Sequence, residues 1–420
     1  MKILWIVNIY IGKLAEQKGL IATSGKWMEA ELQKLYNKDD IQVTVCTTAA
    51  APEKECLQDG NIRYVVLPTG PVHKYRVTDA AVAVWRELLD EEQPDIIQLW
   101  GTEYPHGLAA IRANAGRIPA CVYIQGVISS IALYYRGQLR DKVLRQNQTW
   151  LDFLPGRSVF AAEKRFEKQA VIEQEILREC GHVVLENQWS QDQYSADNPN
   201  LRFYYHRLPL KEEFGALTWS EERCQKHTIL SIASGYPLKG FHILLQALSV
   251  VVKDFPDVRL VVPGASFSEV SGMASMKQGG YGRYIRRMIR EYGLSSHIQF
   301  VGPQSSAELA RLMCDSHVFV TASAVENHCS TLREAMTVGM PCISSYVGGI
   351  PEYLHHKVNG FLYRYEDYRS LAARIMDLFR APSLCREFSQ AARHTMEQMY
   401  REEPLSSLQN IYTQILKEPV

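Results

Sequence analysis

Residues 317–336, HVFVTASAVENHCSTLREAM, hold the pattern that decides the fold. HVFVTAS is a short apolar, β-branched run of the kind that forms a buried strand. The loop AVENHCS follows, and TLRE has the form of a capping box with Thr331 as the N-cap and Glu334 at N3. Gly339 and Pro341 supply the signals that end this helix. The local pattern therefore predicts a strand, a loop and a helix, with Glu334 as a capping residue.

The same turn is also a candidate phosphate site, because backbone N–H groups at a helix N-terminus favour an anion. Glu326 on the loop and Glu334 in the helix would flank that anion. Carboxylates repel phosphate, so each is expected to bind neutral hydroxyls, those of a sugar and those of a ribose. A nucleotide-sugar carries all three groups. The predicted donor-binding residues of the loop and first helical turn are Asn327, His328, Cys329, Ser330, Thr331 and Leu332.

Outward from this stretch, short apolar runs alternate with amphipathic segments of helix length, the pattern of β-α-β units around a parallel sheet. The candidate strands are 2–8, 41–47, 62–68, 95–100, 120–126 and 182–187 in a first series, and 228–234, 258–264, 298–302, 317–323 and 341–345 in a second. Each series completes its own doubly wound sheet. We expect an α/β protein with two Rossmann-like domains facing each other across a cleft.

The 420 residues are too many for one hydrophobic core and suggest two domains. Polar residues 209–227 are the predicted linker. Residues 1–210 then form an N-terminal acceptor-side domain, residues 211–400 a donor domain, and residues 401–420 a C-terminal helix that packs back on the first domain. In such sheets the loops after the strands hold the chemistry.

Residues 127–170 do not fit the alternation, and we predict that they are an insertion in the first domain. Aromatic and basic residues are interleaved in ALYYRGQLRDKVLRQ and WLDFLPGRSVFAAEKRFEKQ. Two interpretations stay open. The segment is either a solvated helical hairpin or an amphipathic surface that contacts a membrane or an acceptor.

Composition excludes several classes of protein. Basic and acidic residues number 46 each, so no overall field favours nucleic acid. The nine cysteines have no disulfide or zinc spacing, which fits a reducing cytoplasm. MKILWIVNIY lacks a cleavage site and reads as a first strand, and no apolar run is long enough to span a membrane. The expected location is the cytoplasm, either free or at the inner face of the membrane.

Three further turns carry candidate phosphate contacts. Lys239 stands at a helix entrance, where it can reach a diphosphate as a point charge. Gly348, in a Gly-Gly turn, lets backbone approach a ligand closely. Ser24 and Gly25 precede a helix in the first half whose N-terminus is a second anion site. Each feature also has a plain structural explanation as a solvated lysine, a turn or an N-cap.

Taken together, these residues resemble glycosyltransferase family 4, the retaining nucleotide-sugar transferases of the GT-B fold. The resemblance rests on the spacing from Glu326 to Glu334, followed by EAM, G.P, S..GG.PE and NG.L, and is weaker in the first half. It implies that Glu326 approaches the transferred sugar and Glu334 holds the ribose. It also implies that Lys239 binds the diphosphate and that Gly25 lies in the N-terminal glycine loop.

Two positions depart from the family. Ser234 stands where the family has an arginine, so neutralisation of the diphosphate must rely on Lys239, helix dipoles or another basic residue such as Arg283. Gln125 stands where the family often has a histidine, and a glutamine cannot act as a base. Glu103 and His106 are the substitute candidates for acceptor contacts.

We therefore predict a metal-independent enzyme without a cofactor, since no D-x-D is present to bridge a diphosphate. Its partners would be a nucleotide-sugar donor, a saccharide or lipid-linked acceptor of bacterial polysaccharide synthesis, and an anionic membrane, with no nucleic acid. Three alternatives remain: a nucleotide-sugar epimerase on the same fold, a glycosidase, which needs no phosphate loops, and a nucleotide-sugar-binding protein without catalysis.

Overall fold

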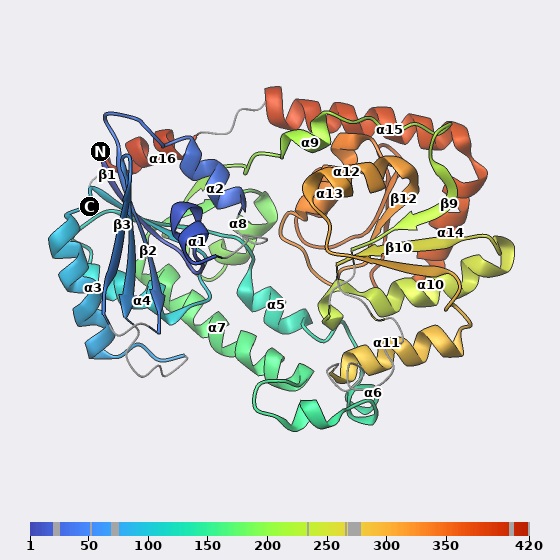
Figure 1. The fold of residues 1–420 in the computed structure, drawn as a ribbon, viewed down its shortest axis with the longest axis horizontal. Coiled ribbons are helices and arrows are strands. Elements are labelled where there is room, and N and C mark those ends of the chain that lie inside the picture. The colour runs from blue at the N-terminus through green and yellow to red at the C-terminus, as the bar shows by residue number, and fades with distance from the viewer. Residues whose placement is uncertain are drawn as a thin grey trace. The chain divides into compact units, whose positions relative to one another are not determined.

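The computed structural model of the chain describes residues 1–19, 26–50, 53–68, 75–232, 235–264, 267, 279–402 and 407–418. The chain divides into two compact units, each with its own sheet (Figure 1). The first unit consists of Met1–Ser129, Phe166–Pro209 and Leu405–Val420, and the second consists of Ser130–Arg165 and Leu210–Pro404.

Within the described ranges, the first unit contains an eight-stranded sheet in the order β3-β4-β2-β1-β5-β6-β7-β8. Its strands are β1 Lys2–Ile6, β2 Gln42–Ala49, β3 Glu55–Asp59, β4 Ile62–Pro68, β5 Ile96–Trp100, β6 Ala120–Tyr123, β7 His182–Leu185 and β8 Arg202–Tyr205. Neighbouring strands are parallel, except that β3 pairs antiparallel with β4 at the edge. The parallel strands are apolar because helices cover both faces of the sheet.

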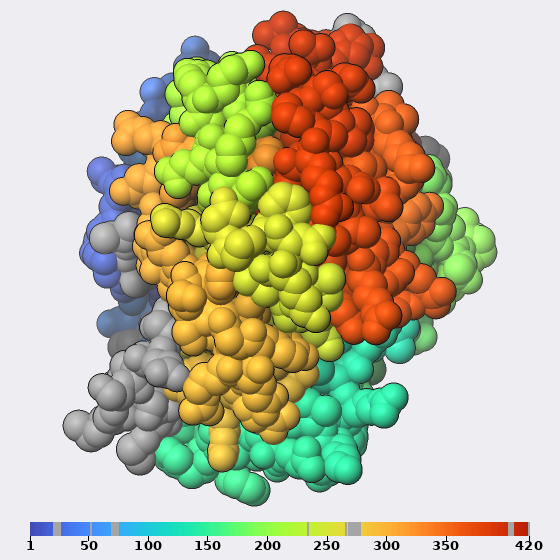
Figure 2. Space-filling view, turned by 90° about the vertical axis from the view of Figure 1, so that its right-hand side faces the viewer, coloured from blue at the N-terminus to red at the C-terminus, as the bar shows by residue number. Residues whose placement is uncertain are grey.

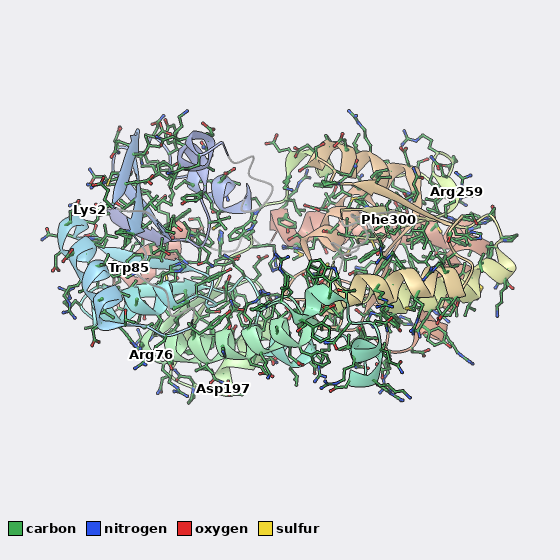
Figure 3. All side chains as sticks on the ribbon, turned by 60° about the horizontal axis from the view of Figure 1, so that its bottom comes forward. Lys2, Arg76, Trp85, Asp197, Arg259 and Phe300 are labelled. Atoms are coloured by element: carbon green, nitrogen blue, oxygen red, sulfur yellow. The ribbon has the colours of Figure 1, made fainter. Side chains whose placement is uncertain are left out.

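The helices of the first unit bury two separate cores against that sheet. They are α1 Gly12–Gln17, α2 Lys26–Gln33, α3 Asp79–Glu92, α4 Pro105–Asn114, α8 Gln188–Ser195 and α16 Leu408–Ile415, together with parts of α5 Ile128–Tyr134 and α7 Val159–Glu179. Trp85 of α3 packs within one core, whereas Lys2 at the start of β1 is exposed (Figure 3). The C-terminal α16 fills the other core, where the Trp5 indole donates to the Tyr412 hydroxyl at 3.1 Å.

Within its described residues, the second unit contains a six-stranded parallel sheet in the order β11-β10-β9-β12-β13-β14. Its strands are β9 Gln225–Leu230, β10 Arg259–Pro263, β11 Ile298–Gly302, β12 Ser316–Thr321, β13 Cys342–Ser345 and β14 Phe361–Tyr363. Its helices include α6 Asp141–Gln146, α9 Glu212–Gly215, α10 Phe241–Asp254, α11 Gly280–Glu291, α12 Ser306–Asp315, α13 Ser330–Val338, α14 Tyr368–Arg380 and α15 Pro382–Glu397. A π-helix, Gln398–Glu402, follows α15.

All eleven predicted strands are present, and the described residues contain three more that the sequence pattern did not indicate. The additional strands are β3, β8 and β14. Strand β3, ECLQD, has only two apolar residues and lies at the sheet edge. Strands β8 and β14 are edge strands of four and three residues. Edge strands this short give no periodic signal over the window that periodicity requires.

The predicted linker, residues 209–227, is packed rather than free. It contains α9, and Trp219 is buried, with its indole donating to the Ser316 carbonyl at 2.8 Å. Strand β9 begins at Gln225. From Leu210 onward, the segment is therefore part of the second unit.

The insertion is the main difference from the predicted domain plan. The sequence places residues 127–170 in the first domain, but residues 130–165 cluster with the second unit. The reason is a set of specific contacts. The Gly137 carbonyl accepts from His242 at 3.1 Å and from Tyr365 at 3.1 Å, and Asp152 accepts from the Gly280 amide at 2.8 Å. Helix α6 also packs on α11, along the lower part of the face in Figure 2.

No helix in the described part of the chain is both long and apolar enough to cross a bilayer. The apolar side chains of α16 pack in the core of the first unit, where Leu408, Ile411 and Ile415 are buried. The C-terminal segment 405–420 accordingly belongs to the first unit.

Candidate active site

The strand order of the second unit reverses between β9 and β12. The first strand of this unit, β9, has β10 and β11 on one side and β12, β13 and β14 on the other. In doubly wound sheets the crevice at such a reversal, at the carboxyl ends of the strands, is where ligands bind. The loops that follow β9, β12 and β13 carry Lys239, Glu326 and Gly348, so the three predicted loops meet at the expected place.

The loop after β9 is held against the loop after β12 by a very close backbone approach. Pro237–Lys239 form a short 3₁₀ turn, and Gly240 follows with a φ of +63°. A Cβ on Gly240 would lie 1.6 Å from the Ala322 carbonyl oxygen, so only glycine fits. The Ala324 amide donates to the Leu238 carbonyl at 2.7 Å. This contact fixes the position of Lys239.

Lys239 and Glu326 form an ion pair at the reversal point. The Lys239 Nζ lies 2.5 Å from Glu326 Oε1, and Ser323 Oγ donates to the same oxygen at 2.6 Å. Both side chains are partly buried, with 30% and 11% exposed. Burial lowers the pKa of Lys239, but the neighbouring Glu326 carboxylate outweighs burial and the pKa is raised overall. The ammonium group therefore stays charged at neutral pH.

Gly348 brings a third loop onto Glu326. Its φ is +53°, and a Cβ there would lie 1.7 Å from the Glu326 carbonyl oxygen. The Gly349 amide donates to the Glu326 carbonyl at 3.3 Å and to that of Asn327 at 3.2 Å. The Gly-Gly turn thus approaches the backbone of the Glu326 loop.

The predicted capping box at Thr331 is wrong. Helix α13 begins at Ser330 with Cys329 as its N-cap, and Cys329 has a φ of +41° without a side-chain capping bond. Glu334 therefore lies beyond N3 and cannot reach back to the N-cap amide. A non-glycine residue in the left-handed region is uncommon and costs roughly 1–3 kcal/mol. This strain at the start of α13 is typical of functional loops.

Glu334 faces inward and is almost fully buried. Its carboxylate lies 3.9 Å from Lys211 Nζ, and Lys211 belongs to the segment that the sequence analysis treated as linker. Burial raises the pKa of Glu334 to about 7, although the positive charges of Lys211 and Arg333 oppose the change. A carboxyl group with this pKa changes its protonation near neutral pH.

The other predicted donor-side residues lie around the same loop. The His328 carbonyl accepts from the Tyr353 hydroxyl at 2.8 Å, and Asn327 is buried. Ser330, Thr331 and Leu332 form the first turn of α13. Arg283, the suggested extra cation, is on α11 and donates to the Gln148 carbonyl at 3.1 Å. The predictions for Ser24, Gly25 and Ser234 fall outside the described residues.

The first unit has a matching reversal between β1 and β5. Asn8 follows β1 and Glu103 follows β5, and the Asn8 amide donates to Glu103 Oε1 at 3.0 Å. Gly101 has a φ of +95°, and a Cβ there would lie 2.5 Å from Glu103 Oε2. Burial raises the pKa of Glu103 to about 7, with a smaller contribution from the charge of Glu173.

His106 and Gln125 also belong to the first unit. His106 lies in the first turn of α4, stacked near Tyr104, and burial lowers its pKa to about 4 although a hydrogen bond with the Val7 carbonyl opposes this. It is therefore neutral at physiological pH. Gln125 is half-buried in the loop after β6.

Several residues at these sites escaped the sequence analysis. Ser323 and Asn8 were counted only as the ends of predicted strands, and Lys211 as part of a linker. The one available signal was position, because Asn8 and Ser323 directly follow strands that flank a reversal. Within the described residues, no group of three or more His, Cys, Asp or Glu side chains is arranged to hold a metal ion.

Comparison with known proteins gives two family matches. The family described as "Glycosyl transferases group 1" matches residues 220–395, and the "Glycosyl transferase 4-like domain" matches residues 30–200. The first match contains the Lys239, Glu326 and Glu334 loops, and the second contains Glu103 and Gln125.

Curated relatives match over part of their length. N-acetyl-alpha-D-glucosaminyl L-malate synthase of Bacillus anthracis is 25% identical over 244 residues, which are 58% of this chain and 58% of that protein. Spore coat protein SA of Bacillus subtilis (strain 168) is 31% identical over 156 residues, 36% of this chain and 39% of that protein. The match thus spans less than two thirds of either relative.

Solved structures match over nearly the whole chain. Sucrose-phosphate synthase from Thermosynechococcus elongatus has a TM-score of 0.67 at 16% identity and covers 99% of this chain and 98% of that one. Anabaena HepE in complex with UDP and glucose has a TM-score of 0.64 at 17% identity and covers 100% of both. At these identities the likeness concerns the fold. With two family matches that together cover most of its length and two parallel-sheet units, this chain belongs to the GT-B glycosyltransferase superfamily.

Proposed function

We propose that the chain is a retaining, metal-independent glycosyltransferase that moves a sugar from a nucleoside-diphosphate sugar to a saccharide or lipid-linked acceptor in bacterial polysaccharide synthesis. The observation that carries this proposal is the Lys239–Glu326 pair, held at the strand reversal of the second unit by two glycine contacts. A cation and a carboxylate at one reversal point suit a ligand that has both a diphosphate and a sugar. The structural neighbour HepE, crystallised in complex with UDP and glucose, supports this ligand class.

Lys239 and the N-terminus of α13 would bind the diphosphate. The ammonium group has three donors, of which one is directed at Glu326, and its raised pKa keeps it charged. Positive groups that stabilise the departing diphosphate lower the barrier for its release without a metal ion. Lys239 and the helix N–H groups would thus neutralise the negative charge of the diphosphate that a divalent ion would otherwise neutralise.

The two glutamates would bind hydroxyl groups. Glu326 is oriented by Lys239 and Ser323 and would contact the transferred sugar. Glu334, buried beside Lys211, would hold the ribose. In the first unit, Glu103 has a pKa of about 7 and can accept a proton from an acceptor hydroxyl, while Gln125 and neutral His106 can only orient it.

The insertion would contact an anionic membrane from the cytoplasmic side. Trp150 and Phe153 are 54% and 76% exposed, large values for such apolar side chains. The basic residues of 130–165 are Arg136, Arg140, Lys142, Arg145, Arg157, Lys164 and Arg165, and the acidic ones are Asp141, Asp152 and Glu163. Asp141 and Glu163 pair with Arg136, so the remaining exposed charge is positive. Exposed aromatic and basic groups together favour an anionic lipid surface.

The epimerase alternative is not favoured, because both family matches are glycosyltransferase families. A glycosidase would not need the phosphate loops. A binding protein without turnover differs from the proposal only in the absence of product, and this difference can be measured.

The test is nucleoside diphosphate release from a panel of nucleotide-sugars, with and without saccharide and lipid-linked acceptors, in EDTA and in magnesium. We expect release that depends on the acceptor, survives EDTA and keeps the anomeric configuration of the donor. Thermal shift with UDP, at about 100 times its Kd, should add about 2.7 kcal/mol to the unfolding free energy. Binding without turnover would support the non-catalytic alternative, and loss of turnover in EDTA that magnesium restores would contradict metal independence.

A further inference from the structure

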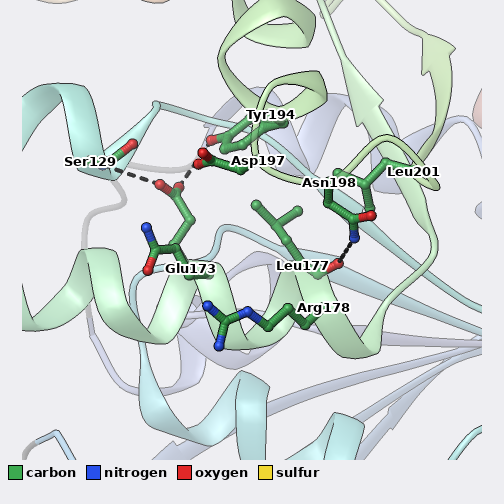
Figure 4. A pocket seen from close by; sticks show the side chains of 9 residues that line it. Ser129, Glu173, Leu177, Arg178, Tyr194, Asp197, Asn198 and Leu201 are labelled. Carbon is green, nitrogen blue, oxygen red and sulfur yellow. Dashed lines mark hydrogen bonds between the residues drawn. The ribbon is translucent and has the colours of Figure 1, made fainter.

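Glu173 is a buried carboxylate at the centre of the first unit that the proposed chemistry does not use. It lies on α7, is 1% exposed and borders a pocket of about 150 Å³. Its oxygens accept four hydrogen bonds: from Thr102 Oγ1 at 2.8 Å, the Tyr194 hydroxyl at 3.0 Å, and the Ile128 and Ser129 amides at 3.1 Å each. Figure 4 shows the carboxylate between Ser129 and Tyr194.

These four donors come from three segments that are distant in sequence. Thr102 belongs to the loop after β5 and immediately precedes Glu103. Ile128 and Ser129 are the first two residues of α5 and directly follow the short loop after β6 that contains Gln125. Tyr194 is on α8. One side chain therefore connects the two carboxyl-end loops that carry the predicted acceptor contacts.

Packing alone does not require a carboxylate at this position. A buried ionisable group is tolerated only when its hydrogen bonds are made, and an apolar residue of similar size would fill the same space at lower cost. A carboxylate differs because its two oxygens can accept several donors in fixed directions at once. The first backbone amides of a helix have no partner within the helix and must find an acceptor elsewhere when buried.

We propose that Glu173 is a positioning residue that fixes the loops after β5 and β6 and so holds Glu103 and Gln125 for the acceptor. The acceptor role of these two residues rests on the proposed function, whereas the tether itself does not. Glu103 also meets Asn8, and the charge of Glu173 adds to the effect of burial on the pKa of Glu103. Because both loops are fixed by the same buried side chain, Glu103 and Gln125 keep a constant geometry relative to each other.

The test compares hydrogen exchange at Gly101, Ile128 and Ser129 in matched variants of the full chain. The Gly101 amide is bonded to the Tyr123 carbonyl and reports on the loop after β5. Glu173→Gln leaves one accepting oxygen instead of two and should speed exchange in both loops at least about tenfold. Thr102→Val removes one bond at nearly constant shape and should speed exchange at Gly101 only, whereas Thr102→Ser keeps the hydroxyl and should leave both loops unchanged.

The controls separate the tether from general stability and from the proposed function. Glu167→Gln changes an exposed carboxyl on the same helix and should alter neither loop. With UDP-glucose as probe, Thr102→Val should lower turnover about tenfold with UDP affinity unchanged, and Thr102→Ser should restore the rate. Unchanged exchange in Glu173→Gln and Thr102→Val would overturn the tether. Faster exchange with unchanged turnover would overturn its link to the acceptor side. A parent chain that does not turn over any nucleotide-sugar would count against the proposed function alone, since exchange would still decide the tether.

Discussion

At the scale of single residues, Lys239 carries the clearest electrostatic role. It stands 2.5 Å from Glu326, on a loop whose position is set by Gly240. The sequence pattern indicates both charged residues through their loops but gives no sign that they pair. Pairing depends on the strand order, which places the loops after β9 and β12 side by side although 87 positions separate the two residues.

Lys239→Ala should weaken binding of UDP-glucose because the diphosphate loses its main side-chain cation. A hydrogen bond to a charged group contributes about 1.5–3 kcal/mol, so kcat/KM should fall roughly 10- to 150-fold. Steady-state kinetics would measure this, with the exposed Lys253→Ala as control. Equal kinetics in Lys239→Ala and the parent would remove Lys239 from the site.

Glu326→Gln should lower kcat without weakening the binding of UDP. The variant keeps the shape of the side chain but loses the negative charge next to Lys239, so the ammonium group is less neutralised and UDP should bind at least as tightly. A carboxylate that acts only on the sugar in the transition state changes kcat and kcat/KM together. Initial rates and UDP titration decide the case. A normal kcat, or weaker UDP binding, would show that the role of Glu326 is assigned wrongly.

Glu334 should make stability depend on pH. Its pKa rises from 4.5 to about 7 on folding, so the folded state binds this proton more tightly. The contribution is fully present below about pH 4.5 and is lost as pH rises through 7, a change on the order of 3 kcal/mol. Glu334→Gln cannot ionise, so its melting temperature relative to the parent should increase from pH 5 to pH 8. Calorimetry measures this, and exposed Glu387→Gln should show no such trend.

The start of α13 shows where local sequence fails. TLRE has the capping-box form, yet the N-cap lies two residues earlier, at Cys329, which is in the left-handed region. A capping residue contributes only about 1 kcal/mol, and the preceding loop is held by its contacts with Lys239 and Gly349. Tertiary contacts therefore decide the N-terminus of this helix.

At the scale of elements, long buried strands are readable from sequence and short edge strands are not. Strand β12 is six buried residues, whereas β14 is three residues at the sheet edge. The positions of the loops after the strands depend on places where two backbone segments approach closely. A single glycine in the sequence does not show that such an approach occurs there. Gly240 and Gly348 both meet a carbonyl oxygen of the β12 loop.

Gly240→Ala should destabilise the second unit more than Gly293→Ala. The two glycines have φ values of +63° and +67°, so the strain of a left-handed alanine, about 1–2 kcal/mol, is common to both. A Cβ on Gly240 would overlap the Ala322 carbonyl, whereas one on Gly293 would meet nothing within 4 Å. Denaturant unfolding should show the difference, and UDP affinity should fall only in Gly240→Ala. Equal stability of the two variants would mean that the loops after β9 and β12 can move apart without loss of folding free energy.

At the scale of the whole molecule, both units reverse strand order next to their first strand. The reversal brings Asn8 to Glu103 in one unit and Lys239 to Glu326 in the other. The two series of strands in the sequence predicted this duplication. The unit to which residues 130–165 and 405–420 belong depends on contacts such as Asp152 with Gly280 and Trp5 with Tyr412, which no local pattern indicates.

The exposed aromatic residues of the insertion give the last prediction. Trp150 and Phe153 lie on one short turn, Trp150–Phe153, whose Asp152 is bonded to the Gly280 amide. That bond anchors the turn to the second unit, so both side chains can enter a lipid interface without unfolding anything. Burying an aromatic or large apolar side chain contributes about 1.5–3 kcal/mol, so replacing both with serine should weaken association with anionic vesicles at least about tenfold.

Sedimentation with phosphatidylserine and phosphatidylcholine vesicles would measure it. The parent should prefer the anionic vesicles, and this preference should fall with salt because the basic residues contribute roughly 1 kcal/mol each near the surface. Val358→Ser, at an exposed apolar position outside the insertion, is the matched control and should bind as the parent does. UDP affinity should be the same in all variants, since the turn lies outside the donor loops. Equal vesicle binding by the double serine variant and the parent would contradict the membrane contact. The insertion would then be a solvated hairpin, and its aromatic residues would contact an acceptor or only water.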